Sequence, residues 1–266
     1  MRTALTIAGS DSGAGAGIQA DLKTFAAHGV YGTSAITAVT AQNSLGVTMV
    51  EALSADLVSA QIEAVVSDFG AHAAKTGMLA NAAIVEAVAA AVRDLDIPLF
   101  VVDPVMIAKS GDQLLDDEAL AAMKAELIEL AFLVTPNIPE AEALTGVDIR
   151  TDEDRREAAR RVIALGATAV VIKGGHWPSD HISDLLLSDG EFVEFRQERV
   201  PGRHTHGTGC TFAAAITAHL ALGHSLRDAI PRVQRYVADA IRHAPDLGRG
   251  HGPMNHFFNF EVRSEK

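Results

Sequence analysis

Two hydrophobic patterns alternate along the 266 residues of the chain. Short apolar runs predict buried β-strands, and apolar residues that recur every three or four positions predict helices with one buried face. Strands are expected at residues 4–8, 31–39, 98–102, 132–135 and 168–172. Helices are expected between residues 18 and 29, from 54 to 69, after 81, and at 119–130, 152–165, 209–222 and 225–243. This alternation predicts an α/β fold in which helices cover both faces of a mostly parallel sheet.

A β-hairpin is expected in the last third of the chain. Two strand-like runs, 182–187 and 191–196, are joined by Asp189-Gly190, a dipeptide that favours a two-residue turn. No linker, low-complexity segment or internal repeat interrupts the pattern. Residues 1–266 are therefore predicted to form a single domain.

The charge balance limits the class of partner. The chain carries 22 Lys and Arg residues against 34 Asp and Glu residues, a formal net charge of −12, and no basic run stands out. This balance argues against a nucleic acid or an anionic membrane as partner. An anionic ligand such as ATP stays compatible, because backbone N–H groups and a metal ion can build a local site for it.

Cysteine use and the length of the apolar segments indicate a cytoplasmic protein. Cys210 is the only cysteine, so no intrachain disulfide can form, as suits a reducing compartment. The apolar run that ends at Gly9 is too short for the core of a signal peptide. No segment approaches the ~20 apolar residues that span a bilayer.

The first candidate site is the segment His-Gly-Thr-Gly-Cys-Thr at 206–211, which precedes an apolar helical run. Glycines at the start of a helix expose unpaired backbone N–H groups, and the helix dipole adds partial positive charge there. Such a terminus can hold a phosphoryl group. The alternative is an ordinary capped helix that contains a buried cysteine.

Two carboxylates follow apolar strands and are the second candidate. Asp103 follows Val101-Val102, and Glu140 lies in the segment 135–140, Thr-Pro-Asn-Ile-Pro-Glu. Carboxylates at the carboxyl edge of a parallel sheet can hold Mg²⁺, and their role would then depend on the cation. Each alone could equally cap a helix or face solvent in a turn. Their combination with a phosphate-type helix terminus favours the metal site.

The glycine-rich segment 9–17 excludes two common nucleotide motifs. A dinucleotide-binding fingerprint would need glycine where Ile18 stands, and no Lys-Ser or Lys-Thr follows the glycines as in a Walker A loop. The glycines do permit a flat ligand to approach the backbone. Gln42, after the second strand, adds an amide that can both donate to and accept from an aminopyrimidine edge.

Two lysines and two histidines complete the candidates. Lys173 ends a strand and could reach a phosphate, while Lys109 lies in a stretch that could act as a lid. A solvated surface position is the alternative for both lysines. His251 and His256 are expected to have structural or surface roles, because no histidine spacing in the chain predicts a metal site.

Taken in order, these segments strongly resemble the hydroxymethylpyrimidine/phosphomethylpyrimidine kinases of thiamine biosynthesis. The resemblance covers essentially the whole chain and rests on IAGSDSGAGAGIQADLKTF, TAQNSLGV, KTGML, VVDPVMIAKSGDQLL, TPNIPEAEAL, VIKGGH, THGTGCTFAAAI and GHGPMNH. One departure is Ala14, which stands where relatives usually carry glycine. The resemblance implies a ribokinase-like fold, a three-layer α/β/α sandwich with a mostly parallel central sheet.

The resemblance also implies a set of site residues. The pyrimidine pocket would be lined by Gly9, Asp21, Gln42, Met78 and Val105. The anion hole would be formed by Gly207, Thr208, Gly209 and Cys210. Mg²⁺ would be held by Asp103 and Glu140. The ATP phosphates would be approached by Lys173, Thr208 and Gly209.

The implied reaction has two steps: ATP phosphorylates hydroxymethylpyrimidine to its monophosphate and then to the diphosphate. Cys210 stands where sugar kinases of this superfamily use an aspartate base, and we expect the helix N-terminus to lower the pKa of its thiol. The implied partners are the pyrimidine, its phosphate and ATP, with a homodimer as the assembly. Three alternatives stay open: a pyridoxal kinase or a dual-activity enzyme, a non-catalytic pyrimidine sensor, and, least favoured, a nicotinamide-dependent oxidoreductase.

Overall fold

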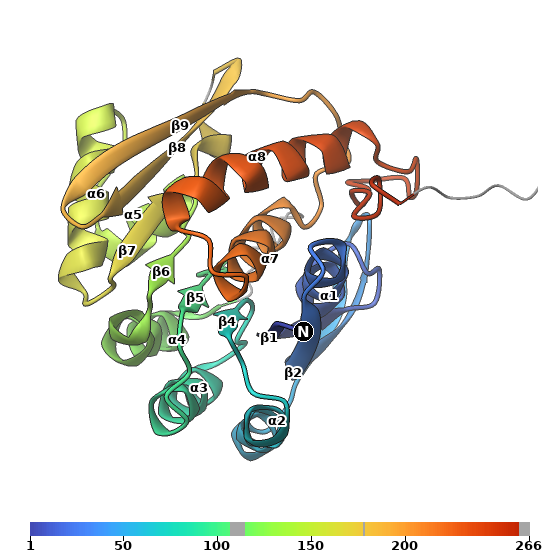
Figure 1. Ribbon diagram of the computed structural model, residues 1–266, viewed down its shortest axis with the longest axis vertical. Helices are drawn as coiled ribbons and strands as arrows, with labels where there is room; N and C mark the ends of the chain where they lie inside the picture. The colour runs from blue at the N-terminus through green and yellow to red at the C-terminus, as the bar shows by residue number, and fades with distance from the viewer. Residues whose placement is uncertain (107–114, 178, 261–266) are drawn as a thin grey trace, which may run out of the picture.

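A computed structural model describes residues 1–106, 115–177 and 179–260. In these residues the strands form a nine-stranded sheet with the order β3-β2-β1-β4-β5-β6-β7-β8-β9 (Figure 1). The strands are β1 (Thr3–Asp11), β2 (Tyr31–Asn43), β3 (Gly46–Ala52), β4 (Ala73–Thr76), β5 (Phe100–Val102), β6 (Leu133–Val134), β7 (Ala169–Ile172), β8 (His181–Ser188) and β9 (Glu191–Glu198). The strands from β2 to β7 in this order run parallel, and β3, β8 and β9 are antiparallel additions at the two edges.

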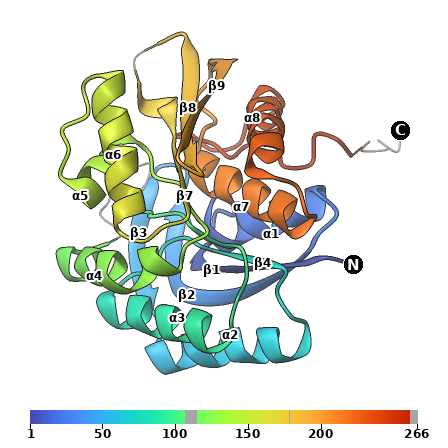
Figure 2. The same ribbon diagram turned by 60° about the vertical axis from the view of Figure 1, so that its left-hand side comes forward.

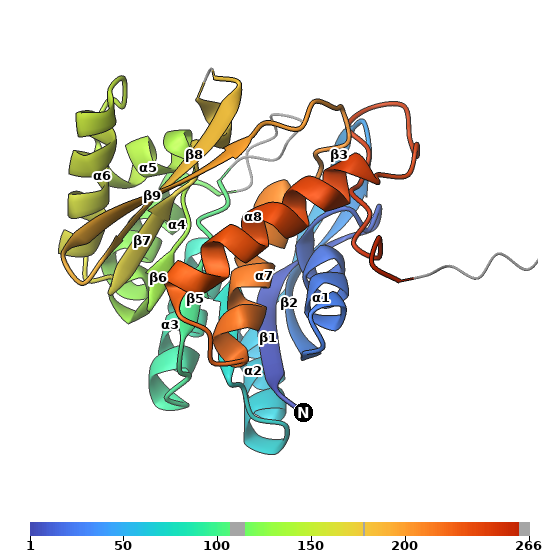
Figure 3. The ribbon, with the colours of Figure 1, turned by 45° about the horizontal axis from the view of Figure 1, so that its top comes forward.

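Helices cover both faces of this sheet. They are α1 (Gly17–Ala27), α2 (Ala55–Asp68), α3 (Ala82–Asp94), α4 (Asp117–Ala122), α5 (Ile138–Thr145), α6 (Asp152–Ala164), α7 (Thr208–Ala221) and α8 (Leu226–Arg242). Helix α4 continues through a π turn, Met123–Leu127, and a 3-10 turn, Ile128–Leu130. Figure 2 shows α2, α3 and α4 together on one face. Figure 3 shows α7 beside the strands with α8 outside it.

Alternate residues of each strand enter two separate cores, as the pleat of a sheet requires. Leu5 and Val102 pack with residues of α2 to α6. Ala4, Val101 and Leu133 pack with residues of α1, α7 and α8. The chain therefore forms the predicted three-layer α/β/α sandwich. Every residue of α7 from Thr211 to Ala221 is buried, which fixes the start of this helix relative to the sheet.

Local signals explain most of the predicted boundaries. Ser54 and Asn81 accept hydrogen bonds from backbone N–H groups in the first turns of α2 and α3. Asp189 and Gly190 both have positive φ, 52° and 75°, as the predicted two-residue turn between β8 and β9 requires. These predictions are confirmed.

Three elements were not predicted, each for a physical reason. Strand β3 is an edge strand whose apolar residues, such as Met49 and Val50, are exposed and mixed with Thr48 and Glu51. Strand β4 contains the charged residue Lys75, which is fully buried and interrupts the apolar pattern. Helix α5 begins with Pro139 in its first turn, a position that proline tolerates but that disguises the helix in the sequence.

In the part of the chain that the structure describes, no helix is long and apolar enough to cross a membrane. The central strands all end at one edge of the sheet, because they run parallel. The loops and helix starts that follow β1, β4, β5, β6 and β7 therefore meet at this edge, where open α/β sheets bind their ligands.

Candidate active site

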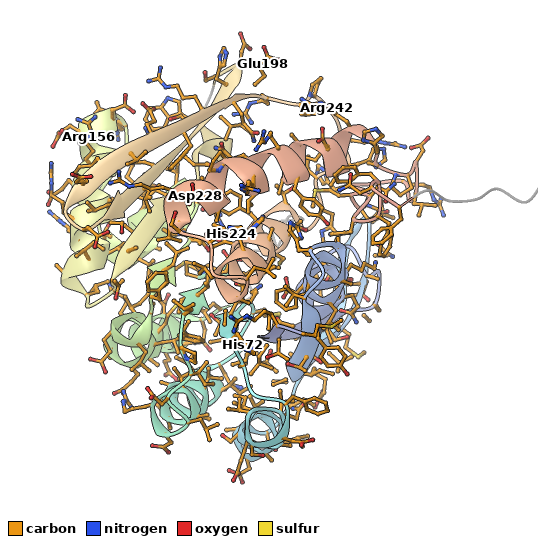
Figure 4. The ribbon with its side chains drawn as sticks, viewed as in Figure 1. His72, Arg156, Glu198, His224, Asp228 and Arg242 are labelled. Carbon is orange, nitrogen blue, oxygen red and sulfur yellow. The ribbon has the colours of Figure 1, made fainter. Side chains whose placement is uncertain are left out.

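A cleft of about 600 Å³ lies at this edge of the sheet and extends to β9 and α8. It brings together eleven of the twelve residues that the sequence predicts for the site: Gly9, Gln42, Met78, Asp103, Val105, Glu140, Lys173, Gly207, Thr208, Gly209 and Cys210. Glu198, at the end of β9, lines the outer part of the cleft, and Figure 4 shows this residue at the edge of the molecule. The segment around Lys109 lies outside the described residues.

The start of α7 forms one wall of the cleft, and it packs tightly against the glycine-rich loop after β1. Gly207 has a φ of 79°, and a Cβ atom there would lie 1.9 Å from the carbonyl oxygen of Gly15. Only glycine fits this position. The Thr208 hydroxyl donates to the carbonyl of Thr205 at 2.7 Å, which closes the turn before the helix. The first N–H groups of α7 are thus held at the cleft, where a phosphoryl group can be bound.

Cys210 lies between the starts of two helices, because the N–H of Gly17 at the start of α1 donates to its thiol. Burial nevertheless raises the pKa of the thiol to about 11. Lys75 opposes this rise, while the carboxylates of Asp21 and Asp103 add to it. The sequence-based expectation of a lowered thiol pKa is therefore wrong: loss of hydration and two nearby carboxylates outweigh the helix termini and the lysine.

A compact charged cluster lies next to this turn. Lys173 Nζ lies 2.8 Å from Asp103 Oδ1 and 3.8 Å from Glu140 Oε2. The hydroxyl of Thr135 donates to the same Asp103 oxygen at 3.0 Å. A Cβ atom on Gly209 would lie 3.5 Å from Lys173 Nζ, so the ammonium group faces the start of α7. Burial alone would lower the pKa of Lys173, but the two carboxylates hold it above its ordinary value.

The two carboxylates of the cluster differ in how they are satisfied. Among the described residues, Asp103 Oδ2 is buried and has no hydrogen-bond partner. Glu140 instead completes a capping box, since its carboxylate accepts the Asn137 N–H at 2.7 Å and its own N–H donates to the Asn137 side chain. The helix-cap alternative for Glu140 is thus correct, although the residue also lines the cleft. Burial raises the pKa of Glu140 to about 7, despite the opposing effect of Lys173.

Asp21 does not lie where the resemblance implied. Its side chain is fully buried and is absent from the lining of the cleft. Asp21 Oδ2 accepts from the Thr6 hydroxyl at 2.6 Å and forms an ion pair with Lys75 at 3.0 Å, entirely inside the protein. The expectation that Asp21 lines the pyrimidine pocket is therefore wrong for this structure, because the side chain turns inward from α1 toward β4.

The cleft is also lined by Asp11 and His206, for which the sequence predicted no individual role. The Asp11 carboxylate accepts from the N–H groups of Gly13, Gly15 and Ala16 at 2.8–3.1 Å, which orders the glycine-rich loop. It also lies 2.8 Å from His206 Nε2. Burial alone would raise the pKa of Asp11. The hydrogen bonds and the nearby His206 outweigh burial, so the pKa lies below its ordinary value.

His206 in turn lies 3.3 Å from the Gln42 side chain, so loop, helix start and amide form one network. The available signals were the position of Asp11 at the end of β1 and of His206 directly before the glycine pair.

The C-terminal histidines have the structural and surface roles that were predicted. His256 is buried and lies 2.9 Å from the Thr211 hydroxyl in the first turn of α7, while His251 is exposed. Across the described ranges, no three His, Cys, Asp or Glu side chains form a group that could hold a metal ion by themselves.

The comparisons with known proteins agree with this geometry. The family model described as phosphomethylpyrimidine kinase matches residues 11–255. The chain belongs to this family. It is 51% identical to the hydroxymethylpyrimidine/phosphomethylpyrimidine kinase of Bacillus subtilis, over 96% of this chain and 94% of that protein.

Solved structures of two kinds of kinase are similar to this one. A phosphomethylpyrimidine kinase from Clostridium difficile is 42% identical, with a TM-score of 0.81 over 91% of this chain and 100% of that one. The pyridoxal kinase of Staphylococcus aureus, in complex with AMP-PCP and pyridoxal, is 35% identical, with a TM-score of 0.89 over 98% and 96% of the two chains. The fold of this phosphomethylpyrimidine kinase family member is thus ribokinase-like, as the resemblance implied.

Proposed function

We propose that this protein transfers the γ-phosphoryl group of ATP to hydroxymethylpyrimidine and then to the resulting monophosphate, in thiamine biosynthesis. The observation that carries the proposal is that a single cleft contains both a region suited to the acceptor and a region suited to phosphate groups. An amide-bearing end suits a flat heteroaromatic acceptor, and a charged end beside the start of α7 suits phosphate groups. Two relatives that are 51% and 49% identical to this chain are named hydroxymethylpyrimidine/phosphomethylpyrimidine kinase.

The acceptor would lie against Gly9, Met78 and Val105, with its aminopyrimidine edge toward Gln42. An amide can donate to a ring nitrogen and accept from the adjacent amino group at the same time. This placement leaves the hydroxymethyl group directed toward the start of α7.

The phosphate groups of ATP would lie between the first turn of α7 and Lys173. The helix terminus offers N–H groups fixed by the Gly207 turn, and Lys173 offers a positive charge that faces Gly209. Phosphoryl transfer is catalysed mainly by positioning and by charge stabilisation, and both are features of this wall of the cleft.

The residues present fit a magnesium ion at the charged end. Asp103 Oδ2 is a buried carboxylate oxygen without a hydrogen-bond partner in the described chain, and Glu140 lies in the same cluster. Mg²⁺ is commonly held by one or two carboxylates together with substrate phosphates and water. Bound there, the cation would offset the negative charge of the phosphate groups. Asp103 and Glu140 would hold it, and Lys173 would keep the two carboxylates from repelling one another.

Cys210 would accept the proton of the acceptor alcohol in the first transfer. The thiol is protonated in the resting protein because its pKa is about 11, so the base form is rare at neutral pH. Little deprotonation is needed until late in a loose transition state. The second transfer needs no base, because its nucleophile is already an anionic phosphate oxygen. One site can therefore serve both steps.

A pyridoxal kinase activity is the second candidate, and a structural observation favours it. The pyridoxal kinase of Bacillus subtilis in its ADP complex has a TM-score of 0.89 against this chain at 38% identity. Pyridoxal also carries a hydroxymethyl group on a six-membered ring. The cytoplasmic location and the homodimer that the resemblance implies stay predictions.

A kinase assay with hydroxymethylpyrimidine and pyridoxal as parallel acceptors tests the proposal. ATP and Mg²⁺ are supplied, and both the mono- and the diphosphate products are followed. We expect both phosphates of the pyrimidine, with a higher kcat/KM for the pyrimidine than for pyridoxal. Phosphorylation of pyridoxal alone would replace the first candidate with the second, and turnover of neither would contradict both.

A further inference from the structure

Which groups donate and which accept in the hydrogen bonds around Gln42 can be worked out from the chemistry of its neighbours. Asp11, ionised because its pKa is held below the ordinary value, can only accept hydrogen bonds. Its carboxylate lies 2.8 Å from His206 Nε2, so Nε2 must carry a proton, whether the ring is neutral or cationic. The single proton of Nε2 is directed to Asp11 at 2.8 Å, and the Gln42 amide, 3.3 Å away, can receive only the weaker arm of a three-centre hydrogen bond from it.

The Gln42 amide has a second neighbour, the hydroxyl of Thr40. Thr40 Oγ1 lies 3.0 Å from the carbonyl oxygen of Ser10 and 3.1 Å from Gln42 Oε1. A hydroxyl has one proton, so it can donate to only one of these oxygens. At the other side of the amide, Gln42 Nε2 lies 3.3 Å from His206 Nε2, which sets two donors against each other.

A half-turn of the Gln42 amide resolves both conflicts. Its oxygen then shares the Nε2 proton of His206 with Asp11 in a three-centre hydrogen bond, and its nitrogen donates to Thr40 Oγ1, whose own proton goes to Ser10. Amide oxygen and nitrogen are distinguished by their hydrogen-bond partners, and this arrangement removes the contact between two N–H donors. The backbone of Gln42 is fixed as well, since its N–H and carbonyl both bond to the hydroxyl of Ser12 at 2.8 Å.

We propose that His206, held by Asp11, is a positioning residue that fixes the Gln42 amide with its oxygen toward α7 and its nitrogen toward Thr40. This inference rests on the proposed function and names what the acceptor must offer. The amide oxygen requires a donor on the ring, and the amide nitrogen requires an acceptor next to it. The 4-amino group and the adjacent ring nitrogen of hydroxymethylpyrimidine meet both needs.

The fixed direction also orients the reacting group. His206 directly precedes Gly207 at the start of α7 and is one neighbour of the amide, while Thr40, in β2, is the other. The hydroxymethyl group of the substrate is attached next to the amino-bearing carbon, on the side away from the ring nitrogen. An amino group bound to the amide oxygen therefore directs the hydroxymethyl group toward α7. The reversed amide would direct it away from the anion hole.

The test compares the amino substrate with its 4-oxo counterpart, 5-hydroxymethyl-2-methylpyrimidin-4-one. The oxo compound presents an acceptor and an N–H where the amino compound presents a donor and an acceptor, so it mismatches a fixed amide at both atoms. We expect the parent enzyme to prefer the amino compound by at least about 100-fold in kcat/KM, since two buried polar contacts would be lost. In His206→Leu the amide can turn, and the preference should fall below about tenfold, mainly through better use of the oxo compound.

Two variants separate positioning from a general structural role. His206→Gln places an amide N–H near the position of Nε2 and should retain most of the preference. His251→Leu removes an exposed histidine outside the network and should leave the ratio unchanged. If thermal unfolding shows that His206→Leu does not fold, Thr40→Val serves instead, because it removes the hydroxyl that contacts the other side of the Gln42 amide. This variant should lower the preference at least about fivefold.

The outcomes distinguish this inference from the proposed function. If the parent phosphorylates neither pyrimidine, the proposed function fails. If the parent uses the amino compound but a folded His206→Leu or Thr40→Val keeps the full preference, the positioning role of His206 is overturned while the kinase activity stands.

Discussion

The two ends of the cleft differ in how completely their polar side chains are paired within the protein. At the acceptor end, Asp11, His206, Thr40 and Gln42 form neutral or fully paired contacts, and the amide orientation proposed here gives each a partner within the protein. At the phosphate end, Asp103 has a buried oxygen without a partner among the described residues, and Glu140 has a pKa of about 7. At the acceptor end each of these side chains already has a partner within the protein, whereas at the phosphate end Asp103 Oδ2 has none among the described residues. The difference predicts different responses to substitution.

Lys173→Met should have the largest effect on stability, because it leaves the carboxylates of Asp103 and Glu140 buried without their cation. Breaking a buried ion pair in this way costs about 3–5 kcal/mol. Urea unfolding of the ligand-free protein measures the loss. The double variant Lys173→Met/Asp103→Asn is the matched control and should recover part of the stability, since it removes both members of the 2.8 Å pair. A single variant as stable as the parent would show that the cluster is not held together by this lysine.

Glu140→Gln should change how stability depends on pH. The carboxyl of Glu140 titrates at about 7 in the folded protein, against an ordinary value of 4.5, so the folded state binds its proton more tightly. The parent therefore loses stability relative to the variant as pH rises from 5 to 8, by up to about 3 kcal/mol. The glutamine side chain can still accept the Asn137 N–H, so the cap is preserved.

Urea unfolding in the presence of EDTA at several pH values checks this expectation. Glu86→Gln, on an exposed position of α3, is the matched control. A constant difference between parent and Glu140→Gln over this pH range would mean that burial does not raise the pKa of Glu140.

Features that depend on local sequence patterns were predicted, and contacts between distant residues were not. Strongly periodic segments and the Asp189-Gly190 turn were predicted because their signals are local. Asp103 and Lys173 were placed at one edge because each follows a parallel strand. The contact of Asp11 with His206 joins residues 195 positions apart, and no local pattern encodes it.

The same limit explains the wrong expectation for Asp21. Its partner Lys75 is 54 residues away, in a strand that was itself hidden by the charge of that lysine. The expected fall of the Cys210 thiol pKa failed for a related reason, since helix termini can be inferred from sequence but burial among other charged groups cannot.

Gln42→Leu should have a smaller effect, confined to the acceptor. The variant leaves polar atoms of the bound pyrimidine unpaired, at a cost of about 1–3 kcal/mol, or roughly 5- to 150-fold in kcat/KM. The preference for the pyrimidine over pyridoxal should fall by a similar factor, while the affinity for ATP stays unchanged. Asn43→Ala, one residue along and outside the cleft lining, is the control. An unchanged preference in Gln42→Leu would remove Gln42 from the acceptor site.

The proton-accepting role of Cys210 is tested most directly by measuring the two phosphoryl transfers separately in Cys210→Ala. Hydroxymethylpyrimidine and its monophosphate are supplied in turn, and each single-turnover rate is compared with that of the parent between pH 7 and 9. We predict a loss of about 100- to 10,000-fold for the alcohol and little loss for the monophosphate, because only the alcohol has a proton to lose. In the parent, the rate with the alcohol should also rise with pH, since the thiol titrates at about 11. Equal losses on both substrates, or a flat profile with the alcohol, would contradict a proton-accepting role for Cys210.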